Sequence, residues 1–323
     1  MNAYKQRHPI HDLLLMIALL LAIFGRPDIS RAQSDDFNDG NDTGWVRYDP
    51  LGTVGLGAQA TNSFPNGGYR IQAFRNPAIP SQAGPARAGA YRTNVYSDFY
   101  MVADIVNWDE SLDQAIGFLA RISNPGLGMT VGYALTYQVP DHDIDITRFT
   151  GEGNFFSVSL SGGPNNDEIT MVPGRSYRYV WIGKGNQFTV RIYELPNLTT
   201  PIVDVTGAED TYTSGFCGFL VFDNSGTANA GLADATFDNY FVQDVEPPKL
   251  FIAPGPFEGD IIVGWPVDTP DTFILQSTTS LSPSTTWTDI TSGIRLSGDG
   301  TRKEYDDNFM SSGPIKFYRL RRP

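Results

Sequence analysis

The chain has 323 residues and a formal net charge of −13 at pH 7, from 36 acidic and 23 basic side chains. This acidity disfavours nucleic acids and anionic membrane surfaces as partners, because their phosphates would be repelled. The single cysteine, Cys217, excludes an internal disulfide, and the single histidine beyond residue 32, His142, excludes the usual zinc sites and leaves one base for a catalytic triad.

Residues 1–32 are predicted to form a secretory signal peptide. Lys5 and Arg7 precede an apolar run from Leu13 to Phe24, and Ala32 is a suitable cleavage point. A retained N-terminal anchor is the alternative, but the apolar run is shorter than the roughly 20 residues that a membrane helix needs. We therefore expect a secreted or cell-envelope protein, periplasmic or extracellular, with no membrane insertion after cleavage.

The rest of the chain is predicted to be all-β. Short runs rich in Val, Ile, Phe, Tyr and Thr alternate with clusters of Gly, Pro, Asn and Asp, and helical periodicity is almost absent. The strands expected in the first part of the chain span residues 69–74, 99–108, 115–122, 130–139, 144–149, 155–160, 176–182, 187–193, 215–222 and 233–242.

The clearest hairpin joins residues 176–182 to 187–193 through a turn at 183–186. Alternation predicts one core face, with Val180, Ile182, Phe188, Val190 and Ile192, and a second face that is rich in aromatic side chains. Sugar sites combine flat aromatics with fixed polar groups. The sequence therefore predicts a carbohydrate site that consists of Trp108, Tyr179, Trp181, Arg191 and Tyr193. In such a site Trp181→Ala would abolish binding and leave the melting temperature nearly unchanged. Structural packing of the same aromatic side chains is an equal alternative.

A domain boundary is predicted at residues 245–248, because Pro247 and Pro248 cannot donate to a β-ladder. It separates a domain at 33–244 from a smaller one at 249–323. Strands of the smaller domain are expected at residues 261–265, 272–277, 286–290 and 315–320. Trp265 and Trp287 are expected to form its core, since a domain of this size needs large apolar anchors.

Three segments resemble the concanavalin A-like lectin/glucanase superfamily in its laminin-G-like branch: DDFNDG at 35–40 with Gly44-Trp45, AIGFLAR at 115–121, and ATFDNYFV at 235–242. The resemblance implies a jelly-roll sandwich that hosts lectins, hydrolases and lyases alike. The tail, with VGWP at 263–266, FILQS at 273–277 and FYRL at 317–320, resembles the fibronectin type III-like modules of exported bacterial proteins. That second resemblance implies a spacer or a surface-attachment unit.

Residues 35–42 contain four aspartates and two asparagines, an oxygen-rich composition that suits calcium. The spacing is not that of an EF-hand. In related sandwiches the first and last strands meet at one edge, so Asp36 or Asp39 would share a Ca²⁺ ion with Asp238. An Asx-rich turn without metal is the alternative.

These patterns favour an exported, non-catalytic carbohydrate-binding or cell-surface accessory protein, with a polysaccharide or cell-surface glycan as partner. A polysaccharide hydrolase or lyase of the same fold is the first alternative. Asp109 and Glu110 are the nearest carboxylate pair, although neighbours on a strand point to opposite faces. A structural envelope or matrix protein is the second alternative, favoured if Tyr179 and Trp181 are buried.

Overall fold

The computed structural model describes residues 32–75, 84–162, 168–225, 231–244, 248–267, 269, 273–282, 285–308 and 316–321. Residues 1–31 of the predicted signal peptide and 245–247 of the predicted linker lie outside these ranges. In the described ranges, no helix has the length and apolar character needed to cross a membrane. The chain divides into two compact units, Met1–Val245 and Glu246–Pro323.

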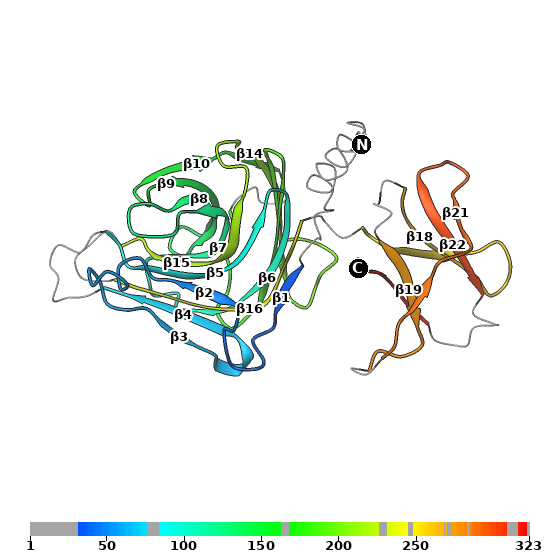
Figure 1. Ribbon diagram of the computed structural model, residues 1–323, viewed down its shortest axis with the longest axis horizontal. Coiled ribbons are helices and arrows are strands. Elements are labelled where there is room, and N and C mark those ends of the chain that lie inside the picture. The colour runs from blue at the N-terminus through cyan, green and yellow to red at the C-terminus, as the bar shows by residue number, and fades with distance from the viewer. Residues whose placement is uncertain are drawn as a thin grey trace, which may run out of the picture. The chain divides into compact units, whose positions relative to one another are not determined.

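The first unit is a two-layer antiparallel sandwich, which confirms the predicted all-β fold class (Figure 1). One layer is a nine-stranded sheet in the order β11-β14-β13-β12-β6-β16-β4-β3, with β1 also paired to β16. Its strands are β1 (Gln33–Asp35), β3 (Thr61–Ser63), β4 (Tyr69–Phe74), β6 (Phe99–Trp108), β11 (Leu160–Gly162), β12 (Tyr177–Lys184), β13 (Gln187–Glu194), β14 (Val203–Ala208) and β16 (Leu232–Gln243). A short 3-10 turn, η1 (Pro65–Gly67), precedes β4.

The other layer is a seven-stranded sheet in the order β10-β9-β8-β7-β15-β5-β2, whose β8, β9 and β10 curl strongly in Figure 1. Its strands are β2 (Trp45–Tyr48), β5 (Arg87–Tyr96), β7 (Gln114–Ser123), β8 (Val131–Gln138), β9 (Asp143–Thr150), β10 (Asn154–Val158) and β15 (Gly215–Asp223).

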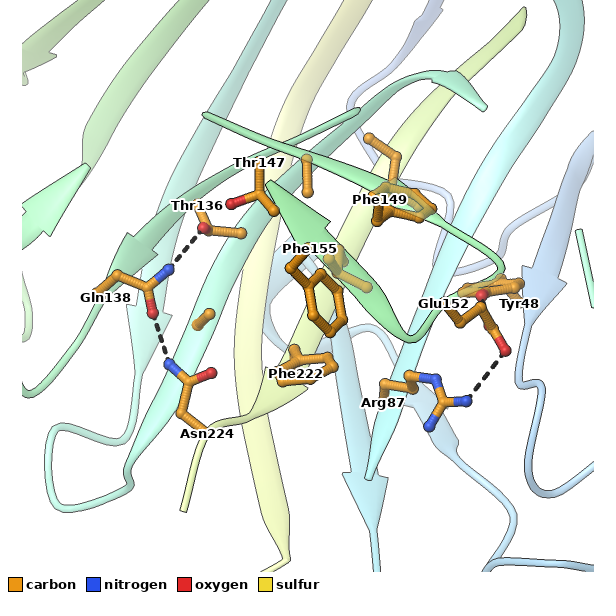
Figure 2. A pocket seen from close by; sticks show the side chains of 14 residues that line it. Tyr48, Arg87, Thr136, Gln138, Thr147, Phe149, Glu152, Phe155, Phe222 and Asn224 are labelled. Atoms are coloured by element: carbon orange, nitrogen blue, oxygen red, sulfur yellow. Dashed lines mark hydrogen bonds and ion pairs between the residues drawn. The ribbon is translucent and has the colours of Figure 1, made fainter. Parts of the chain in front are cut away.

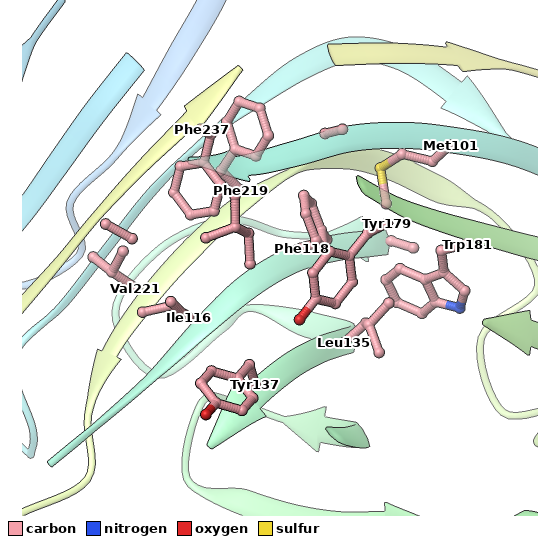
Figure 3. Close-up of a cluster of buried hydrophobic side chains, with 14 of the residues drawn as sticks. Met101, Ile116, Phe118, Leu135, Tyr137, Tyr179, Trp181, Phe219, Val221 and Phe237 are labelled. Atoms are coloured by element: carbon pink, nitrogen blue, oxygen red, sulfur yellow. The ribbon is translucent and has the colours of Figure 1, made fainter. Parts of the chain in front are cut away.

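Aromatic side chains from both sheets fill the space between the layers. Phe118 and Phe219 of the seven-stranded sheet meet Tyr179 and Phe237 of the nine-stranded sheet, with ring centroids 5.1 Å apart for Phe118 and Tyr179 and 4.5 Å apart for Phe219 and Phe237 (Figure 3). This apolar burial is the main stabilising contribution to the sandwich.

The register of the β12–β13 hairpin corrects the predicted assignment of its faces. Lys184 pairs with Gln187 across a two-residue turn, and Trp181 pairs with Val190. Directly paired residues share a face, so the odd-numbered residues of β12 lie on the same side of the sheet as the even-numbered residues of β13. The aromatic residues of β12 and the aliphatic residues of β13 therefore share one face, and it is the core face.

The second unit consists of two small sheets. One has the order β17-β18-β22-β21, from β17 (Phe251–Pro254), β18 (Asp260–Pro266), β22 (Arg302–Asn308) and β21 (Ile294–Leu296). The other has the order β20-β19-β23, from β20 (Thr288–Ile290), β19 (Ile274–Thr278) and β23 (Phe317–Arg321). Trp265 is buried with Val263 and Leu275, whereas Trp287 is half-buried beneath the guanidinium of Arg319. The fibronectin III-like classification stays a prediction.

Candidate functional site

The structure does not bring the five predicted carbohydrate-binding residues together on an accessible surface. Tyr179 and Trp181 are each 1% exposed and Trp108 is 5% exposed, all within the main core. Arg191 and Tyr193 are half-buried on the opposite, outer face of the nine-stranded sheet, where Arg191 lies 3.5 Å from Asp204. The expectation of a shared accessible face is wrong, because the aromatic residues of β12 pack inward.

The aspartates predicted to bind calcium serve first as turn acceptors. Asp36 accepts a hydrogen bond from the backbone N–H of Asn38, and Asp39 accepts one from Asn41. Burial raises the pKa of Asp238, and the charges of Asp104 and Asp36 raise it further. Across the described part of the chain, no group of three or more His, Cys, Asp or Glu side chains could hold a metal ion. Calcium binding stays a prediction.

Asp109 and Glu110 line an open depression at the end of β6. Asp109 is exposed, and hydrogen bonds from Ser111 lower the pKa of its carboxyl group. Asp234 lines the same depression but is held by Arg70 through both carboxylate oxygens. Its full lining among the described residues is Arg70, Asn107, Trp108, Asp109, Glu110, Ser111, Pro173 and Asp234.

A second hollow lies on the outer face of the seven-stranded sheet, and we call it the groove (Figure 2). It has a volume of about 170 Å³ and draws residues from β2, β5, β7, β8, β9, β10 and β15. The described residues that line it are Tyr48, Arg87, Ala115, Leu119, Ala134, Thr136, Gln138, Thr147, Phe149, Glu152, Phe155, Leu220, Phe222 and Asn224.

Glycines in the floor of the groove leave space above the sheet, because they have no side chain. Gly117 pairs with both Leu220 and Thr136, so it shares their outer face. A Cβ atom at Gly117 would lie 2.0 Å from the carbonyl oxygen of Leu135, and one at Gly89 would lie 2.1 Å from that of Phe219. No larger residue therefore fits on these closely spaced strands.

The floor is also apolar. A second buried cluster, separate from the main core, lies on this side of the sheet and consists of Tyr48, Tyr91, Leu119, Ile122, Ala134, Phe149 and Leu220. An outer sheet face is normally polar, because only one face of an antiparallel sheet needs to be covered. An apolar hollow on an outer face indicates a surface that is built for contact.

Phe155 projects over the groove from the edge strand β10 (Figure 2). Its side chain is 53% exposed and meets Phe222 edge-on, with ring centroids 5.8 Å apart and planes at 78°. Phe156, next along the strand, is also exposed, but its ring lies 4.3 Å from the guanidinium carbon of Arg148 and is not part of the groove lining. Phe155 thus offers an accessible aromatic face beside the apolar floor.

Amide and hydroxyl groups form one end of the groove. The Gln138 side-chain amide donates to the hydroxyl of Thr136 at 2.9 Å, and its oxygen accepts a hydrogen bond from the Asn224 amide at 2.5 Å. Figure 2 shows this chain of polar groups on the side of the groove away from Glu152. The hydrogen bond between Gln138 and Asn224 fixes the orientation of both side-chain amides. A ligand hydroxyl at this end of the groove would therefore meet donors and acceptors in fixed positions.

A buried ion pair forms the other end. Arg87 and Glu152 are joined at 3.0 Å between Nη2 and Oε2, and both side chains are buried. Glu152 also accepts hydrogen bonds from the hydroxyl of Tyr48 and from the backbone N–H of Gly128 at 2.7 Å. Its backbone has φ = 61°, after Gly151 with the same φ, which tucks a charged side chain beneath the β9–β10 turn.

Burial raises the pKa of Glu152 to about 6, against the lowering effect of the Gly128 N–H. Because this pKa exceeds the unfolded value, the folded state binds the proton more tightly than the unfolded chain does. The resulting stabilisation is full below about pH 4.5 and is lost as pH rises through about 6, a difference of at most about 2 kcal/mol. We expect the unfolding free energy of the wild type, relative to Glu152→Gln, to fall across this window in urea titrations; parallel pH profiles would contradict the assignment.

The groove was not predicted from the sequence, although the pattern of one strand indicates an apolar outer face. The strand at residues 215–222 is apolar at nearly every position, and such a strand has no face left for solvent. Its outer residues, Leu220 and Phe222, line the groove. The partners that complete the site, from Tyr48 to Asn224, are brought together only by the fold.

No protein-family model and no curated protein sequence matches the chain. Solved structures similar to it include the carbohydrate-binding module CBM66 from Bacillus subtilis, at 15% identity and a TM-score of 0.43 over 63% of this chain and 97% of that chain. Lectin II from Ulex europaeus has 12% identity and a TM-score of 0.42, over 68% and 99% of the two chains. An endo-β-galactosidase from Clostridium perfringens has 9% identity and a TM-score of 0.44, over 86% and 83%. At these identities the similarity concerns the fold alone.

Proposed function

We propose that the protein is an exported, non-catalytic carbohydrate-binding protein, and that it holds a polysaccharide or cell-surface glycan in the groove on the outer face of its seven-stranded sheet. The observation that supports this most directly is the exposed ring of Phe155 above an apolar floor with polar groups at both ends. Sugars present C–H faces and a rim of hydroxyl groups, and the groove is complementary to both.

The size of the groove favours a chain that lies along the surface over an enclosed small molecule. Its volume of about 170 Å³ is below the roughly 300 to 1,000 Å³ of pockets that enclose drug-sized ligands. The polar groups are restricted to the two ends, so a ligand that reaches both must extend across the floor. A glycan segment of a longer chain meets this requirement.

The proposal predicts binding of the mature protein to at least one polysaccharide on a glycan array, with the hit quantified by calorimetry. The array is run in Ca²⁺ and again in EDTA. Equal affinity in both would show that glycan binding does not depend on calcium and would leave the groove proposal intact. Absence of binding to every polysaccharide, from a protein with a cooperative melting transition, would overturn the proposed function.

An enzyme of the same fold is the second candidate, favoured by the depression that gathers Asp109, Glu110 and Asp234. Glu152 is the only carboxyl group among the described residues that line the groove, so the paired carboxylates of a glycosidase are not assembled there. Release of reducing ends, or of unsaturated products that absorb ultraviolet light, from the array hit would establish hydrolysis or lyase activity. Loss of that activity in Asp109→Asn would place the active site in the depression.

A structural role is the third candidate. It gains from the burial of Tyr179 and Trp181, which removes the aromatic surface expected from the sequence. The groove on the opposite sheet supplies a different accessible surface, with Phe155 and Phe222 at its centre. The same glycan array separates the two, because a purely structural protein would bind none of the polysaccharides.

A further inference from the structure

We infer that the groove selects neutral glycans over polyuronates, and that Glu152 is the residue that determines this specificity. The inference rests on the proposed function and names the substrate class of the same site. It depends on the charges around the groove and on how they are paired.

Arg87 is the one cation among the described residues of the groove lining, and it is held away from an anionic ligand. Its Nη2 atom is paired with Glu152 at 3.0 Å and its Nη1 atom donates to the carbonyl oxygen of Pro85 at 2.9 Å. Arginine is the usual partner of carboxylates because its fork can donate two parallel hydrogen bonds. Glu152 already uses one arm of this fork, so a ligand carboxylate finds no free bidentate partner.

Glu152 is held firmly in this blocking position. Oε2 accepts hydrogen bonds from Arg87 and from the backbone N–H of Gly128, while Oε1 accepts from the hydroxyls of Tyr48 and Thr130. These donors come from β2, β5 and the segment before β8, so the carboxylate is fixed from three sides. The carboxylate therefore keeps its position beside Arg87 and neutralises the one cation among the described residues of the lining.

The surroundings of the groove also oppose anions. Asp143 pairs with Gln138, and Asp145 pairs with Thr136, which places both aspartates on the outer face that carries the groove. The chain as a whole has a net charge of −13. A polyuronate would have to approach this negative surface without a cation to bind, whereas a neutral glycan needs only the apolar floor and the polar ends.

The direct test compares soluble neutral oligosaccharides, from β-glucan, xylan and galactan, with oligomers of alginate and polygalacturonate. Affinities are measured by calorimetry at pH 7.5 in about 0.15 M salt, which limits long-range repulsion. We expect the wild-type protein to bind a neutral oligosaccharide at least tenfold more tightly than either polyuronate. Comparable or tighter binding of a polyuronate would overturn the selectivity and leave carbohydrate binding in place, whereas binding of neither class would overturn the proposed function itself.

The role of Glu152 is tested with Glu152→Gln, which keeps the side-chain shape and uncovers the charge of Arg87. We expect a gain of at least tenfold in polyuronate affinity, with neutral binding retained as evidence of folding. Glu258→Gln, at an exposed position of the second unit, makes the same change in net charge and should show no gain.

The double variant Arg87→Gln/Glu152→Gln removes both charges and should lose any gain of the single variant. A gain that persists in the double variant, or a folded Glu152→Gln without any gain, would show that Glu152 does not determine the selectivity. If Glu152→Gln does not fold, the wild-type comparison still decides the selectivity, and the double variant tests the role of the Arg87–Glu152 ion pair. A polyuronate affinity equal to that of the wild type would agree with a pair that is already neutral in the wild type. A gain in polyuronate affinity would contradict it.

Discussion

Replacing Phe155 with alanine is expected to weaken glycan binding at least tenfold, or about 1.4 kcal/mol. The exposed ring lies over the apolar floor of the groove, and its truncation removes the most exposed aromatic surface among the described residues of the groove lining. Because the side chain is half-exposed on an edge strand, the variant should lose no more than about 1 kcal/mol of stability. Calorimetric titration with the glycan found on the array measures the first effect, and thermal unfolding measures the second.

Phe156→Ala is the matched control for this experiment. Phe156 is 48% exposed on the same strand, but it points to the other face and packs against Arg148 rather than lining the groove. Its removal should cost about 0.5 to 1 kcal/mol through the lost cation–π contact and leave glycan affinity unchanged. Equal losses of affinity in both variants would indicate a general effect on β10, and no loss in Phe155→Ala would remove Phe155 from the site.

Trp181→Ala should lower stability strongly, with an expected cost of about 3 to 5 kcal/mol. The indole is 1% exposed and belongs to the core cluster drawn in Figure 3. Its ring centroid lies 5.4 Å from that of Phe99 and 5.8 Å from that of Phe188. A lowering of the melting temperature on the order of 10 °C follows for a domain of this size. This is the reverse of the sequence-based expectation, in which Trp181 was a surface residue.

Arg191→Ala serves as the comparison, because Arg191 lies on the outer face of the neighbouring strand and pairs loosely with Asp204. Its cost should stay within about 1 kcal/mol, as for an exposed ion pair. Guanidinium chloride unfolding of both variants tests the corrected register. Similar stabilities for Trp181→Ala and the wild type would mean that the indole is not in the core.

The sequence predicts the strands well where β-branched and aromatic residues recur in short runs between turn residues. The strand predicted at residues 99–108 has the same bounds as β6, and those at 69–74 and 187–193 agree with β4 and β13 within one residue. The sequence-based prediction misses β5, because the first half of this strand is rich in alanine and glycine, which have little β propensity. In β5 the small residues reflect close strand spacing, which only the assembled sheet imposes.

The error in the hairpin faces has a single physical cause. The predicted core face grouped even-numbered residues of both strands, such as Ile182 and Phe188, and only a turn with an odd number of residues would pair them. A turn with an even number of residues, like the observed one, pairs odd-numbered with even-numbered residues, as for Trp181 and Val190. Glycine and asparagine at positions 183–186 are compatible with more than one turn length, so local sequence does not determine which strand residues pair. The choice is made by the core, which requires the largest apolar side chains on the inner face.

The groove lies beyond the reach of local patterns, because its residues span the chain from Tyr48 to Asn224. Glu152 illustrates the difficulty. In the sequence it is an ordinary acid between two glycines in a turn, and only the fold places Arg87 and Tyr48 beside its carboxylate. Its burial could be recognised only once the β9–β10 turn is seen to fold against β2 and β5.

A nuclear magnetic resonance titration of the labelled protein with the bound glycan would locate the site in one experiment. The proposed function predicts the largest shifts in the ring signals of Phe155 and Phe222 and in the side-chain amides of Gln138 and Asn224. Shifts confined to the outer face around Arg191 and Tyr193, or to the depression at Asp109, with the groove signals unchanged, would contradict it.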